Sequence, residues 1–309
     1  MFVSYRGSIL GLLSWQWRSV LLFALASTAV VLVDHFFPEA IDVATLPMAP
    51  VAVVGGAIGI FVSFRTNSAY DRWWEGRKLW GRLINSSRHF ASQVLTYLPA
   101  PEQRTLAETL VRRHVAYVHA LRVLLRDQSL RDDPEFVASL PTGEQGSDLD
   151  AIAEQSNPTH ALLYQQLDAL VAEADAGRLD ALRLQSLDQT LRELLDIQGG
   201  CERIKRTPFP RGYGFIADRL IQAYGVLLPL GLVSGIHNDW VVIPLTMLVC
   251  MSFALISETG RVLEDPFTMF WPALPLSALS TTIEVNLRER LGDADLPPMR
   301  KPDARGVLM

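Results

Sequence analysis

The histidines and cysteines are the residues of this chain best suited to catalysis or metal binding, and their spacing favours neither. His114 and His119 lie five positions apart in a segment expected to be helical, which points the two side chains away from a common face. Together with His89 they are better interpreted as satisfied structural histidines. Cys201 and Cys250 exclude a disulfide framework and a cysteine-rich metal site, and we interpret them as inert apolar residues. The sequence therefore predicts no catalytic residue, no metal site and no cofactor, and the protein is not expected to be an enzyme.

Nucleotide and nucleic-acid chemistry are also not indicated. The glycine-rich segment 55–59 lies inside an apolar run and lacks the lysine of a phosphate-binding loop, so it favours close helix packing. The formal net charge of −5 argues against a nucleic-acid partner. No Ser/His/Asp set or close pair of carboxylates stands out in the sequence.

The basic residues are distributed in a way that predicts membrane spans. Residues 19–64 and 220–260 contain no Lys or Arg. Each gap divides into two uncharged segments around an acidic break. The four segments are 19–33, 43–64, 220–238 and 240–257. A membrane-spanning helix needs about 20 apolar residues, and Arg18 can extend the short first segment by snorkelling. The pattern predicts two helical hairpins.

The flanking charges predict the orientation of these hairpins. Basic residues flank the outer ends of both hairpins, whereas the tips carry only acidic residues and His, so both termini and the middle segment are expected to be cytoplasmic. Residues 2–17, with Trp15 and Trp17, are expected to form an interfacial helix. Two other interpretations are less favoured. One is a signal peptide cleaved near Ala24-Leu25-Ala26, and the other is a soluble protein with four buried helices.

The remaining sequence has a soluble composition and a helical pattern. Helices are expected over 65–98, 102–127, 159–176 and 179–206, with a polar loop over 128–158. The fold class is therefore an all-α integral membrane protein with four transmembrane helices and a helical cytoplasmic portion. The predicted parts are an N-terminal helix (1–18), hairpin 1 (19–64), a cytoplasmic region (65–212), hairpin 2 (213–258) and a cytoplasmic C-terminal segment (259–309).

Three features of the spans and their ends are unusual. Gly56, Ile60 and Phe64 follow one another at intervals of four and form a stripe on the second span. In a monomer this stripe is a packing face, which the spacing alone favours, but in a symmetric ring it would be a hydrophobic constriction. Aromatic and charged residues crowd the end of the same span, and two prolines around Phe209 fix a rigid turn before the third span.

These motifs together resemble the bestrophin family, in its bacterial branch, over nearly the whole chain. The resemblance is carried by Arg72-Trp73-Trp74 with the following Glu75-Gly76-Arg77, by Pro208-Phe209-Pro210 with Tyr213, and by Glu264-Asp265-Pro266-Phe267.

The resemblance implies a homopentameric ion channel with one axial pore, in which the second span of each subunit forms a narrow neck. By position, Ile60 and Phe64 resemble neck residues, Gly56 the outer neck position and Phe209 the ring of a lower cytosolic aperture. Gly56 replaces the bulky apolar residue usual in the family, which implies a wider ring. Phe209 replaces an aliphatic residue, which implies a narrower exit.

The resemblance also implies partners and leaves alternatives open. The partners are further copies of the chain, membrane lipid and monovalent ions, at the inner membrane. The acidic run that forms the calcium site of animal members is missing after Pro266-Phe267, so no calcium site is expected there. Chloride and sodium or potassium all stay open as the permeant ion, with a weak preference for cations. A transporter and a membrane scaffold or sensor without a pore are the rival functions.

Overall fold

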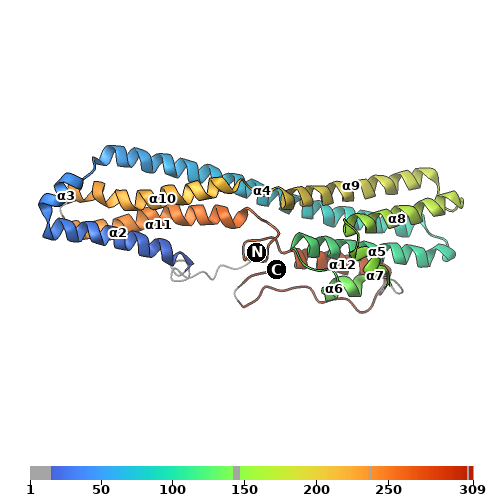
Figure 1. The fold of residues 1–309 in the computed structure, drawn as a ribbon. Helices are drawn as coiled ribbons and strands as arrows, with labels where there is room; N and C mark the ends of the chain where they lie inside the picture. Colours follow the sequence, from blue (N-terminus) through green and yellow to red (C-terminus); the bar gives the residue numbers. More distant parts are fainter. Residues whose placement is uncertain (1–14, 142–146, 237, 305, 309) are drawn as a thin grey trace. The chain divides into compact units, whose positions relative to one another are not determined.

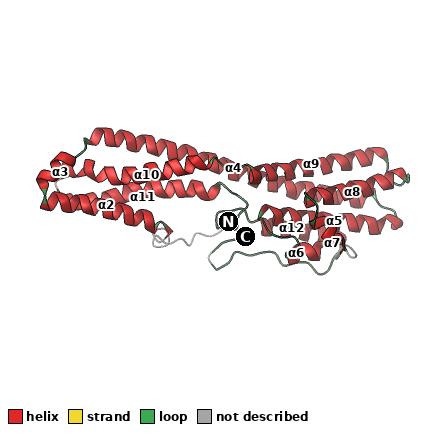
Figure 2. Ribbon diagram, in the orientation of Figure 1, coloured by secondary structure: helices red, strands yellow, loops and turns green. Residues whose placement is uncertain are grey.

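The structure is a computed structural model that describes residues 15–141, 147–236, 238–304 and 306–308. Within these residues the chain forms helices and turns and contains no strand (Figure 2). The all-helical prediction is therefore confirmed, whereas most of the interfacial helix expected over 2–17 lies outside the described residues. The chain divides into two compact units. We call the described residues of 5–73 and 208–264 the membrane unit, and the described residues of 74–207 and 265–309 the bundle unit.

The membrane unit consists of four long helices that run side by side (Figure 1). They are α2 (Trp17–Phe36), the first part of α4 (Met48–Tyr97), α10 (Arg211–Leu232) and α11 (Val242–Leu263). All four are long and apolar enough to cross a membrane, as the two gaps in basic residues predict. A helix satisfies most of its backbone hydrogen bonds internally, which a spanning segment requires, and Pro229 inside α10 leaves one such bond unmade.

The tip of the first hairpin is helical. Short helix α3 (Pro38–Ala44) fills the acidic break between the first two spans. Pro38 occupies the first turn, where its missing N–H costs nothing, and the carboxylate of Glu39 favours a helix N-terminus. The tip of the second hairpin contains two 3₁₀ turns, Val233–Gly235 and Asp239–Val241.

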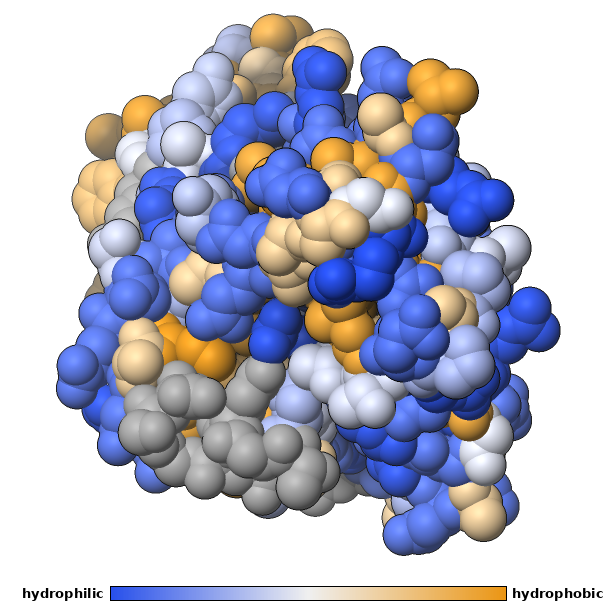
Figure 3. All heavy atoms as spheres, turned by 90° about the vertical axis from the view of Figure 1, so that its right-hand side faces the viewer, coloured by the Kyte–Doolittle hydropathy of each residue, from blue (hydrophilic) through white to orange (hydrophobic). Residues whose placement is uncertain are grey.

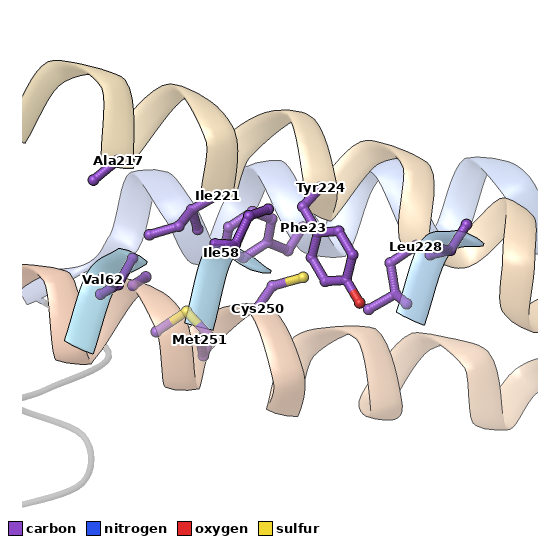
Figure 4. Packing of buried hydrophobic residues seen from close by; sticks show 11 residues of the cluster. Phe23, Ile58, Val62, Ala217, Ile221, Tyr224, Leu228, Cys250 and Met251 are labelled. Atoms are coloured by element: carbon purple, nitrogen blue, oxygen red, sulfur yellow. The ribbon is translucent and has the colours of Figure 1, made fainter. Parts of the chain in front are cut away.

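The core of the membrane unit draws side chains from all four helices (Figure 4). Phe23 of α2 is fully buried and packs against side chains of α4, α10 and α11. Two glycines allow this close approach, because a Cβ on Gly225 would overlap the Phe23 ring and a Cβ on Gly55 would overlap the Tyr224 ring. Small residues are favoured between membrane helices because packing replaces the hydrophobic drive that lipid does not supply. The buried cluster comprises Phe23, Val51, Ile58, Val62, Ala217, Ile221, Tyr224, Leu228, Cys250, Met251 and Ala254.

The bundle unit is built around helix α5 (Arg104–Leu125), which follows the 3₁₀ turn Pro101–Gln103. Helices α8 (Pro158–Asp175), α9 (Ala181–Arg206) and α12 (Leu276–Leu291) pack against α5, as does the short α6 (Pro134–Ser139). The second part of α4 also belongs to this unit. Figure 3, which views the molecule from the right-hand side of Figure 1, shows a mainly hydrophilic face with small scattered apolar patches.

The helices of the bundle unit largely follow the sequence pattern. The Asp180 carboxylate accepts hydrogen bonds from the backbone N–H groups of Leu182 and Arg183 and thereby caps α9. The side chain of Asn157 caps α8 in the same way. The expected polar loop over 128–158 was partly wrong, because α6 and α7 (Ser147–Ala153) form inside it. The cap of α6, Asp133, and the proline after it are the local signals for that helix.

The close approach at Gly225 gives a testable prediction. Gly225→Ala should lower the unfolding free energy by about 1–3 kcal/mol, because the new methyl group overlaps a fully buried ring. Gly212→Ala is the matched control on the same helix, since a Cβ there meets nothing within 4 Å. We expect the control to unfold at an equal or higher temperature in detergent. Equal stability of the two variants would contradict this packing.

Candidate pore-lining face

Helix α4 presents two distinct faces within the membrane unit. Its buried positions, Val51, Gly55, Ile58 and Val62, recur every three or four residues and pack into the core. The opposite face is apolar and uncovered in the single chain. Ile60 is 61% exposed and Phe64 is 69% exposed, although both are large apolar residues.

Gly56 belongs to the uncovered face as well. It is exposed, and a Cβ built on it meets nothing within 4 Å. The structure therefore places the three positions of the predicted stripe on one open face and leaves none of them in the core. Such a face can form an apolar constriction wherever several copies surround one axis, because narrow apolar passages exclude water.

A buried arginine lies one residue beyond this face. Arg65 is only 3% exposed. Its Nη1 donates to the carbonyl oxygen of Ser257 at 3.2 Å and to the Ser257 Oγ at 3.0 Å, while its Nη2 donates to the Glu264 carboxylate at 2.6 Å. The Ser257 hydroxyl in turn donates to Asp218 at 3.0 Å. The network joins α4, α10 and α11 through a charge that would be very unfavourable if it were unpaired.

The tryptophan motif connects to the same network. The Nε of Arg72 donates to the backbone carbonyl of Glu264 at 2.6 Å, so Glu264 binds two arginines of α4. The rings of Tyr70 and Trp73 stack with a centroid distance of 6.1 Å. Trp74 is 46% exposed and begins the bundle unit. Arg72 of the Arg72-Trp73-Trp74 motif therefore helps to hold α4 against the end of α11.

The proline turn before α10 positions Phe209 within the membrane unit. Pro208, Phe209 and Pro210 are outside any helix, and Pro210 is the N-cap of α10. The Phe209 ring packs edge-on against Tyr213 at 6.0 Å, and Tyr213 stacks on Phe61 at 5.4 Å. Phe61 is the chain neighbour of Ile60. Phe209 is thus linked by two ring contacts to the helix that carries the predicted neck.

Two of the three predicted structural histidines are buried and have partners, whereas His89 is exposed. The buried His114 hydrogen-bonds the Ser87 hydroxyl at 2.9 Å, and burial lowers its pKa to about 3, so the ring is neutral at physiological pH. The buried His119 contacts the Glu284 carboxylate at 2.9 Å. Burial raises the pKa of the Cys201 thiol to about 12, which makes it unreactive. The described residues contain no group of three or more His, Cys, Asp or Glu side chains arranged to hold a metal ion.

Sequence reasoning missed the Arg65 network and helix α12. Arg65 is the first basic residue after the gap that begins at residue 19, and Glu264 follows the last span. Opposite charges at the ends of two apolar runs were therefore the only sequence signal for this ion pair. The pairing itself spans 199 positions and has no local signature.

Four apolar helices packed around two buried apolar clusters define a polytopic helical membrane protein. The family model described as bacterial/fungal bestrophin protein matches residues 1–289. The chain therefore belongs to the bacterial and fungal bestrophin family.

Named relatives and a solved structure agree with this assignment. The chain is 32% identical to a voltage-dependent anion channel-forming protein of Mesorhizobium japonicum, over 98% of this chain and 92% of that protein. It is 31% identical to a protein of the same description from Escherichia coli K12, over 97% and 93% of the two chains. The crystal structure of a bacterial bestrophin homolog from Klebsiella pneumoniae superposes with a TM-score of 0.80 at 29% identity and covers 90% of this chain and 99% of that one.

The buried arginine gives a second prediction. Arg65→Met should lower the unfolding free energy by about 3 kcal/mol, because it leaves Glu264 and Ser257 without their donor. Arg82→Met is the matched control, since the ion pair of Arg82 with Glu193 is about half exposed on both sides. The control should change stability by less than about 0.5 kcal/mol. Similar losses in both variants, measured by denaturant unfolding in detergent, would rule out a special role for Arg65.

Proposed function

We propose that this protein is a homopentameric ion channel of the inner membrane that passes monovalent ions by passive electrodiffusion. The observation that carries the proposal is the uncovered apolar face of α4, on which Ile60 and Phe64 are more than half exposed in the single chain. The channel-forming description of the relatives supports the same function. In this proposal five copies of α4 surround the axis.

The neck would act through its apolar surface. Rings of Ile60 and Phe64 offer no hydrogen bond to an ion or its water shell, so passage depends on the width and wetting of the neck. Gly56 contributes no side chain to the outer ring, which favours a wider mouth. An apolar neck does not select the sign of the ion, and that property must come from charged groups elsewhere on the pathway.

The topology follows from the charges that flank the spans. The outer ends of both hairpins carry the basic residues, which favours cytoplasmic termini and a cytoplasmic bundle unit. The boundaries 1–18, 19–64, 65–212, 213–258 and 259–309 stay predictions within this topology.

A channel is favoured over the rival functions for a structural reason. Transporter sites place polar groups or broken helices near the middle of the membrane. In this chain the buried charge of Arg65 lies at the end of the apolar run of α4 and is paired with groups at the end of α11. An oligomer with no open path along its axis would instead support a scaffold without a pore.

The neck assignment predicts a change in conductance. Ile60→Ala and Phe64→Ala should each raise single-channel conductance by roughly twofold or more, because a smaller ring widens and wets the constriction. Leu248→Ala is the control, since it removes a side chain that is 68% exposed on α11. Conductance should be measured in planar bilayers on pentamers verified by size. Unchanged conductance in both neck variants would remove the assignment.

The lower cytosolic aperture, which is a second constriction of the proposed pore, gives a separate prediction. We propose Phe209 as its ring, and the contacts with Tyr213 favour a position near the start of α10. Phe209→Ala should change conductance or selectivity and leave assembly intact. Leu182 is the comparison position, because it is 74% exposed at the first turn of α9 in the bundle unit. An effect of Leu182→Ala together with no effect of Phe209→Ala would move the second constriction to the bundle unit.

A further inference from the structure

The exposed face of α4 continues past the neck positions. Seven residues make nearly two full turns of an α-helix, so Asp71 returns to the face of Phe64, displaced by about 20° around the helix and about 10 Å along it. The structure agrees with this geometry, because Asp71 is exposed whereas Arg65 and Ala69 are buried on the other side of the helix.

Asp71 is the first charged group on this face after the neck. Between Phe64 and Asp71 the exposed positions are Asn67, Ser68 and Tyr70, none of which carries a charged side chain. The basic residues of this stretch, Arg65 and Arg72, point their donors to Glu264.

The carboxylate of Asp71 is not neutralised by any group in the described part of the chain. Among the described residues no hydrogen bond or ion pair involves it, whereas the terminal nitrogens of neighbouring Arg65 donate to Ser257 and Glu264. Lys78 follows one further heptad along α4, which puts its Cα about 10 Å beyond the Cα of Asp71 along the helix. An ion leaving the neck on this face therefore meets the negative group first.

We infer that Asp71 determines charge selectivity by placing a ring of carboxylates at the cytoplasmic end of the neck, where it favours cations over anions. The inference rests on the proposed function, in which five copies of α4 line one axis. Five uncompensated charges around a narrow passage concentrate counter-ions and repel co-ions, and this bias acts on ions that the apolar neck does not itself distinguish.

The test is the reversal potential of purified protein in a bilayer under a KCl gradient. Asp71→Asn should lower the permeability of potassium relative to chloride by roughly fivefold at about 0.05 M salt, and by less at about 1 M salt, where the Debye length is only about 3 Å. Asp188→Asn is the matched control, since Asp188 is an exposed aspartate on α9. The control should keep the wild-type reversal potential.

A rescue experiment tests the charge itself. Asp71→Cys should lose cation preference, recover it after reaction with the anionic reagent sulfonatoethyl methanethiosulfonate, and shift further toward chloride after reaction with its cationic trimethylammonium counterpart. The native Cys201 and Cys250 are buried, so the wild-type protein serves as the unreactive control.

The outcomes separate this inference from the proposed function. Current in the wild type with the same ion preference in Asp71→Asn would overturn the role of Asp71 and leave the channel in place. Absence of current from a verified wild-type pentamer would overturn the channel, and the role of Asp71 with it.

Discussion

A positive charge buried at the end of the apolar helices constrains how the membrane unit can assemble. Arg65 has almost no contact with solvent, so its guanidinium must find acceptors inside the protein. It finds them on α11 and directly after it, in Ser257 and Glu264, and Ser257 extends the network to α10 through Asp218. Any rotation of α4 would withdraw the charge from these partners. The network therefore fixes which side of α4 turns inward.

Fixing the rotation of α4 also decides which side chains are left outside. With Arg65, Val62 and Ile58 turned toward the core, the helical period leaves Ile60 and Phe64 on the uncovered side. Packing within one chain does not account for large apolar side chains at these two exposed positions. The orientation of the apolar face follows from the buried polar contact of Arg65. This face is the structural feature that could line a pore in a family with channel-forming members.

The helices of the bundle unit depend on polar networks of a different kind. The carboxylate of Glu173 accepts hydrogen bonds from Arg178 and Gln103, and these donors lower its pKa to about 2. In α5, two buried histidines have hydroxyl or carboxylate partners. These contacts specify how amphipathic helices pack, and they do not create reactive groups. His114 and His119 are therefore part of the scaffold.

The sequence by itself determined the helical class, the four spans, and the approximate starts of α5, α8 and α9, because hydropathy runs, prolines and caps act over one or two turns of chain. It also determined that Gly56, Ile60 and Phe64 share a face, since the helical period fixes relative direction. Only the tertiary structure decided that this face is uncovered and that Asp71, which the helical period returns to it, is exposed. The direction of a face toward core or outside depends on contacts such as Arg65 with Glu264, which joins residues 199 positions apart and leaves no local pattern in the sequence.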